Sequence, residues 1–207
     1  MAQSSLVKAI DRVVNSAQDK YNEIMESEHV SRNIEIDGVK TRGQMEEQKK
    51  RTTTKDEYTR TVTCMLGVDV KRGSLIGIED HNKKWDYGVV VSIPQKTPVD
   101  YLFTCLLFNT SAKRYRKQLV YSDDGYVVGD NPLIVDEIPC FVQRIGMRQR
   151  QVDVGIDSNA VNEIITSKKW DIQKGDILHI GSERYKITDL RELDKEVCQG
   201  YMTFYRE

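Results

Sequence analysis

The sequence lacks any apolar run long enough to cross a membrane. Its longest nearly apolar stretch, Tyr101 to Phe108, falls far short of the roughly 20 residues of a transmembrane helix. It also lacks an excess of either charge, because 31 basic and 32 acidic residues leave a formal net charge of -1. A chain so close to neutral has no global signature of a nucleic-acid-binding protein. Charges at Lys8, Asp11 and Arg12 interrupt the N-terminal segment, so we expect no secretory signal there.

Paired cysteines of the kind found in disulfide frameworks and zinc sites are also missing. The four cysteines lie far apart, no two form a C-x-x-C pair, and each lies in or beside an apolar segment: Cys64, Cys105, Cys140 and Cys198. This pattern predicts buried, reduced thiols in a protein made in the cytoplasm. With 207 residues, 39% of them hydrophobic, the chain can bury a core as one large or two small domains.

No complete catalytic framework is present. The sequence has no G-x-x-x-x-G-K-[ST], G-x-G-x-x-G, G-x-S-x-G or H-E-x-x-H motif. Its three histidines, His29, His81 and His179, stand apart from one another, and Asp123-Asp124-Gly125 is typical of a hairpin turn rather than of a calcium loop. We therefore expect a protein that is not an enzyme and uses no cofactor or metal, while a site assembled from distant residues stays open.

The N-terminal segment has a clear helical period. Apolar residues recur at steps of three and four from Leu6 to Met25, with charged residues on the other face, and this predicts an amphipathic helix over residues 1–27. The apolar stripe either covers the protein's own core or docks on another subunit. The candidate oligomer contacts are Ile10, Val14, Ala17, Tyr21 and Ile24.

Residues 28–57 have few large apolar side chains and a charged, threonine-rich run from Gln44 to Lys55. Only Ile34-Glu35-Ile36 resembles a short strand. A stretch of this length without core residues is typical of a linker or of an arm that becomes ordered against a partner. We therefore expect residues 28–57 to form a polar arm.

Beyond Tyr58 the chain has the character of a β protein. Short segments rich in Val, Ile, Thr, Tyr and Phe alternate with polar turns, which predicts a small antiparallel β-barrel or sandwich. We expect a β-rich domain over residues 58–150 and a C-terminal barrel module over residues 151–207 that either completes or repeats the fold. Within the latter, Gln151 to Ile156 is a predicted strand and Ser158 to Ser167 a predicted helix.

Two segments, one in each of these predicted regions, resemble each other in sequence, and we call this resemblance the echo. Residues 68–78 (VDVKRGSLIGI) can be laid on residues 170–180 (WDIQKGDILHI), with the Asp, the Gly and the last Ile coinciding. Each segment predicts a turn followed by an apolar strand, and the turn needs a glycine, which is Gly73 in the first segment and Gly175 in the second. The echo either marks a duplicated antiparallel unit or is a chance recurrence of a short β pattern.

One basic cluster, Lys113-Arg114-Tyr115-Arg116-Lys117, combines four cations with an aromatic ring. Such a cluster can neutralise phosphates and stack a base, or it can be a solvated strand edge that Lys and Arg protect from mispairing. Lys113, Arg114, Arg116 and Lys117 are therefore weak candidates for nucleic-acid contacts.

The C-terminal segment Lys174 to Asp189 reads K-G-D-I-L, a glycine-containing turn and R-Y-K-I-T-D. It resembles the β-barrel of tailed-bacteriophage head-to-tail connector proteins of the head-closure or stopper family, and of related neck and tail components. The resemblance implies that Gly175 and Gly181 shape turns and that Tyr185 and Ile187 fill the barrel interior, with no catalytic role.

The resemblance also implies a structural virion protein that forms part of a homo-oligomeric ring in the neck. Its expected partners are portal, adaptor or tail proteins, and its expected place is the virion after assembly in the host cytoplasm, with no membrane. A DNA contact stays open, although nothing in the sequence indicates one. The chain is longer than a minimal stopper and looks doubled, which keeps a tail or baseplate component open. A small β-barrel nucleic-acid-binding module is the other alternative.

Overall fold

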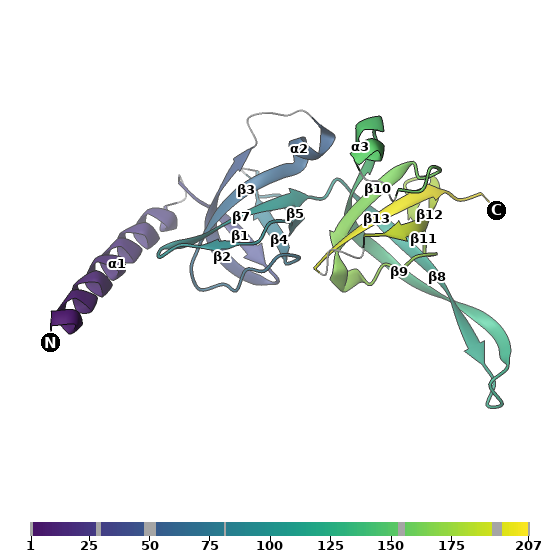
Figure 1. The fold of residues 1–207 in the computed structure, drawn as a ribbon, viewed down its shortest axis with the longest axis horizontal. Helices are drawn as coiled ribbons and strands as arrows, with labels where there is room; N and C mark the ends of the chain where they lie inside the picture. The colour runs from purple at the N-terminus through teal and green to yellow at the C-terminus, as the bar shows by residue number, and fades with distance from the viewer. Residues whose placement is uncertain are drawn as a thin grey trace. The chain divides into compact units, whose positions relative to one another are not determined.

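The computed structural model describes residues 2–27, 30–47, 53–80, 82–152, 156–191 and 196–206. The chain divides into two compact units, residues 1–107 and 108–207, and each contains a closed antiparallel barrel (Figure 1). The prediction of a mainly β fold built from small antiparallel barrels, with an N-terminal helix, is confirmed. Among the helices of the described residues, none is long and apolar enough to cross a membrane.

The first unit begins with the long helix α1 and continues into six barrel strands and one short added strand. In the barrel the neighbouring strands follow the order β3-β2-β1-β4-β5-β7, and pairing of β3 with β7 closes it, while β6 pairs only with β7 in the described part of the chain. The elements are α1 (Ala2–Glu26), β1 (Arg32–Ile36), β2 (Val39–Glu47), α2 (Thr54–Tyr58), β3 (Thr59–Met65), β4 (Leu75–Glu79), β5 (Trp85–Val90), β6 (Gln95–Lys96) and β7 (Asp100–Leu107).

The prediction of a polar arm over residues 28–57 is wrong, because β1 and β2 are two of the six barrel strands. Ile34 and Ile36 point into the core of the first barrel and are fully buried. Strand β2 has few apolar residues because a glycine takes one of its interior positions: a Cβ on Gly43 would lie 2.3 Å from the Ile34 side chain and 2.6 Å from the Thr63 backbone oxygen. Close approach of the strands thus replaces a large side chain.

The second unit is a barrel of six strands with the order β10-β13-β12-β11-β8-β9, closed by pairing of β9 with β10. Its core is made of aliphatic, aromatic and sulfur-containing side chains from all six strands and from the turn before β11. The elements are β8 (Thr110–Tyr121), β9 (Val127–Arg144), α3 (Met147–Val152), β10 (Asn162–Ser167), the 3-10 turn η1 (Lys168–Trp170), β11 (Ile177–Ile180), β12 (Glu183–Leu190) and β13 (Val197–Phe204).

The two barrels share one topology. We number the six strands of each barrel in chain order and leave out β6. Around each barrel the order is then first, second, third, sixth, fifth and fourth, and every pairing is antiparallel. The echoing segments lead into β4 and β11, which are the fourth strands. The boundary between the units lies at residues 107 and 108, so the predicted boundary at 150 and 151 is wrong. Residues 151–207 supply only four of the six strands of the second barrel.

The predicted helix over Ser158 to Ser167 is also wrong. Asn162–Ser167 forms strand β10, which pairs with β9 on one side and β13 on the other. The β-branched run Ile164-Ile165-Thr166 suits a strand buried on both faces, and pairing on both sides overrides the weak helical spacing. The predicted strand over Gln151 to Ile156 is contradicted at its start, where α3 ends at Val152, and residues 153–155 lie outside the described residues.

Candidate functional site at the base of a projecting hairpin

The hairpin of β8 and β9 extends far beyond its barrel. Leu178 of β11 pairs with Arg114, just as the equivalent Ile76 of β4 pairs with Ile36 in the first barrel. After Ile36 the first barrel turns at once through two residues, whereas β8 and β9 stay paired from Thr110 to Tyr121 before they turn. We call residues 116–133 the arm; Figure 1 shows it as a teal ribbon that leaves the second barrel.

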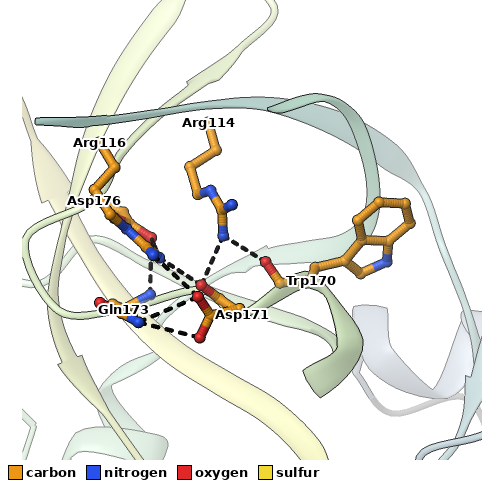
Figure 2. Close-up of polar contacts among 6 residues, drawn as sticks. All are labelled: Arg114, Arg116, Trp170, Asp171, Gln173 and Asp176. Carbon is orange, nitrogen blue, oxygen red and sulfur yellow. Dashed lines mark hydrogen bonds and ion pairs between the residues drawn. The ribbon is translucent and has the colours of Figure 1, made fainter. Parts of the chain in front are cut away.

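Arg114 fixes the strand where it leaves the barrel. Its side chain is only 4% exposed, and its Nη1 donates to the backbone oxygens of Trp170 at 2.5 Å and of Asp171 at 2.6 Å. These two carbonyls belong to the turn that precedes β11, residues 170–176, which we call the base turn (Figure 2). One guanidinium can bind both carbonyl oxygens because it presents several N–H donors in a rigid plane.

Arg116 makes a second and stronger attachment at the root of the arm. Its Nε and Nη2 donate to the two carboxylate oxygens of Asp176 at 2.6 and 2.8 Å, and its Nη1 reaches Asp171 at 3.0 Å (Figure 2). The Asp176 side chain is 2% exposed, and one of its oxygens also accepts the backbone N–H of Gln173 at 2.8 Å. A two-pronged contact of this geometry fixes direction as well as distance.

The charged groups at this site shift the pKa values of one another. The hydrogen bond from Arg116 holds the pKa of Asp171 below its usual value, and the Gln173 amide adds to this effect. The hydrogen bond to Asp176 in turn raises the pKa of Arg116. The guanidinium therefore stays charged, and the site serves to hold a strand rather than to exchange protons.

The base turn has the same geometry as a turn in the first barrel. In both turns a glycine of positive φ, Gly73 at 85° and Gly175 at 94°, donates its N–H across to the next strand at 2.8 Å. In both, the next side chain caps the turn: Ser74 Oγ accepts from Lys71 N at 3.2 Å, where Asp176 accepts from Gln173 N at 2.8 Å. The two turns thus share one geometry, and in the second barrel the capping side chain is an aspartate that also binds Arg116.

The side chains on the outside of the second barrel form a basic and aromatic surface beside the arm. Strand pairing aligns Lys113, His179 and Arg184 in one row, and places Tyr115, Ile177 and Lys186 in the next. The Tyr115 and His179 rings lie 4.2 Å apart, and Lys113 Nζ lies 5.8 Å from the centre of the Tyr115 ring. We call these six residues the outer face.

The arm ends in an exposed turn, residues 122–126, which we call the tip. Hydrogen bonds from Gly125 N to Ser122 O and from Ser122 N to Tyr126 O, both 2.8 Å, close the turn. Asp123 and Asp124 are exposed, and Tyr126 is 75% exposed. The tip therefore presents two carboxylates and an aromatic ring to the solvent.

The structure places the residues of the predicted turns and barrel interior as follows. Gly73, Gly175 and Gly181 all have positive φ, and Tyr185 and Ile187 point into the second barrel and are buried. Burial raises the pKa of Tyr185 to about 12, and a hydrogen bond with Glu183 adds to the shift.

The candidate oligomer contacts on α1 lie in different surroundings. Ile10, Ala17 and Ile24 are exposed, whereas Val14 and Tyr21 are partly covered. The end of the helix meets the first barrel: Met25 is buried, and Gln18 donates to the backbone oxygen of Val99 at 2.9 Å. The stripe therefore stays open over its N-terminal part.

The basic cluster divides by strand alternation. Arg114 and Arg116 bind the base turn, Lys113 lies on the outer face, and Lys117 belongs to β8, with a side chain outside the described set. Sequence analysis missed the pairing of Arg116 with Asp176 because the two residues lie 60 positions apart. A signal did exist in the echo, where Asp176 replaces Ser74.

The four cysteines are free and buried. Of the histidines, His29 and His81 lie outside the described residues. Within the described ranges, no group of three or more His, Cys, Asp or Glu side chains is arranged to hold a metal ion.

Comparison with known proteins adds no assignment. No protein-family model matches the chain, and no characterised protein matches its sequence. Among solved structures, the chain shows a likeness to MrkH, described as a c-di-GMP-dependent transcription regulatory factor, with 8% identity over 93% of this chain and 83% of that one. The TM-score is 0.23, and a likeness at that level carries no argument about fold or function.

Proposed function

We propose that this protein is a structural component that works by self-association, as part of a bacteriophage neck or head-to-tail connector ring. A ring needs one patch on each subunit that meets a different patch on the next. Two closed barrels supply rigid bodies, and a projecting element supplies the reach.

The observation that carries this proposal is the anchored arm. A two-stranded ribbon is at best marginally stable on its own in water, yet here Arg114 and Arg116 hold its root in one direction. The first barrel has the same strand order without such an extension, so the fold itself does not require the arm. An element that the fold does not need, fixed at its base and exposed at its tip, suits contact with another subunit.

The virion role rests on the resemblance of residues 174–189 to connector barrels. In the structure this segment forms the end of the base turn and the β11–β12 hairpin, so the residues that carry the resemblance adjoin the root of the arm. Portal, adaptor or tail proteins are the partners that the proposal implies. A tail or baseplate component is the nearest alternative with the same mode of assembly.

Two measurements test the proposal. The purified full chain should have the mass of several copies by light scattering at tens of micromolar, and negative-stain images should show closed rings. Mass spectrometry of purified phage particles from the source that encodes the protein should find it in the virion. A protein that stays monomeric and never occurs in particles would overturn the proposal.

A further inference from the structure

We infer that the tip of the arm docks on the outer face of the second barrel in a neighbouring copy of the same chain. This inference rests on the proposed self-association, and it names the two patches that would meet. The contact is between different surfaces of identical subunits, which is the type of contact that closes into rings.

The two surfaces are complementary in charge. The tip carries Asp123 and Asp124, both exposed. The outer face carries three exposed cations, Lys113, Arg184 and Lys186, and the exposed Glu137 lies at the adjoining bulge. Opposite charges steer two copies together and reject the tip-to-tip arrangement, in which carboxylates would face each other.

The apolar parts of the two surfaces also fit one another. At the tip Tyr126 is 75% exposed and Val127 is 55% exposed. The outer face offers the contacting rings of Tyr115 and His179 and the partly exposed Ile177 beside them. Aromatic and apolar side chains at the centre with charges around them are typical of protein interfaces.

The length of the arm shows why the occupant of the outer face comes from another molecule. Tyr115 lies on the outer face itself, and β8 continues from it as a paired strand to Tyr121. At about 3.3 Å per residue, the tip is about 26 Å further along the strand than Tyr115. The tip thus points away from its own outer face, and a second copy must supply the receiving surface.

Charge reversal tests the pairing in the full chain. Asp123→Lys with Asp124→Lys reverses the tip, and Arg184→Glu with Lys186→Glu reverses the outer face. The hydrogen bonds that close the tip use Ser122, Gly125 and Tyr126, so the reversed tip keeps its turn. Each pair of substitutions should raise the concentration at which copies assemble by at least about tenfold, measured by light scattering and sedimentation at about 0.1 M salt.

The chain that carries both reversals is the decisive sample. Every reversed tip then meets a reversed face, and assembly should return to within about threefold of the parent chain. Lys40→Glu with Lys84→Glu makes the same change of charge at exposed positions of the first unit, outside the tip, the outer face and the base turn, and should leave assembly unchanged.

The other results overturn the inference in distinguishable ways. A parent chain that is monomeric at every concentration removes both the inference and the proposed function. A parent that assembles, together with tip and face variants that assemble equally well, removes only the inference, as does a doubly reversed chain that fails to recover. If the face variant assembles normally but no longer binds a labelled 30-nucleotide single strand that the parent binds, the outer face is a nucleic-acid surface instead.

Discussion

Replacing Arg116 by methionine tests whether the base of the arm is held as the structure indicates. The substitution keeps a long side chain but leaves Asp176, whose side chain is 2% exposed, without its two guanidinium hydrogen bonds. Removing one partner of a buried ion pair costs about 3–5 kcal/mol. The Arg116 side chain is 19% exposed and Gln173 N still donates to the carboxylate, so we expect a loss of about 2–4 kcal/mol from the second barrel.

The first barrel supplies the matched control for this substitution. There Ser74 caps the equivalent turn in place of an aspartate, so Arg116→Met combined with Asp176→Ser gives the base turn a neutral cap that needs no guanidinium partner. The double variant removes the buried charge along with its partner and should recover to within about 1 kcal/mol of the parent.

The assay must report on the second barrel alone, because the chain has two units that can unfold separately. Trp170, in the base turn, serves as the fluorescent probe in a background where Trp85 of the first barrel is replaced by phenylalanine. Urea unfolding followed at Trp170 then gives the free energy of unfolding of each variant. A single variant within about 0.5 kcal/mol of the parent would refute the reasoning, and so would a double variant as unstable as the single one.

Three further predictions concern other parts of the molecule. Gly43→Ala should destabilise the first barrel by about 3 kcal/mol in urea unfolding, because the new methyl group would meet a backbone oxygen 2.6 Å away; Gly146→Ala, with open space around it, should cost less than about 0.5 kcal/mol. Burial raises the pKa values of Cys105 and Cys140 from 9.0 to about 12. At pH 9 iodoacetamide should therefore leave these thiols unlabelled in the native protein and label them in urea. The protonated thiols favour the folded state, and this contribution to the free energy of unfolding should fall only as the pH rises from about 9 to 12. Deleting residues 2–16 removes the open part of the α1 stripe and should lower the mass of the assembly while both barrels keep their unfolding midpoints; an unchanged mass would show that the helix is not an oligomer contact.

The sequence allowed prediction of the elements whose apolar pattern is local. Helix α1 and most barrel strands follow from their periods, and the echo between residues 68–78 and 170–180 made a repeated unit one of two open interpretations. The repeat was detectable because each copy needs the same glycine of positive φ at one turn, a requirement of the backbone that few residues meet.

Two errors came from segments whose strand character depends on pairing with other strands. The sequence of strand β2 resembles that of a polar segment outside the core, because Gly43 packs against β1 and β3 where a large apolar residue would be expected. Strand β10 looked like a short helix because its pairing with β9 and β13 on both sides has no local signature. In both segments tertiary pairing outweighed local propensity.

The candidate site was the least predictable feature. A basic cluster in a nearly neutral chain left two interpretations open, and the structure shows that its members point to opposite sides of β8. Arg114 and Arg116 meet residues that follow them by more than 50 positions, so only the folded barrel brings the groups together.

The most direct test of the central claim is the mass of the full chain with and without the arm. Replacing residues 117–132 by Asp-Gly joins Arg116 to Leu133 through a two-residue turn of the kind that the first barrel uses after Ile36, without leaving Pro132 beside the turn, and it keeps Arg116 and its partner Asp176. Sedimentation at matched concentrations should show a multimer for the parent and a folded monomer for the shortened chain, with the Trp170 unfolding transition preserved. A shortened chain that forms the same multimer as the parent would contradict the account.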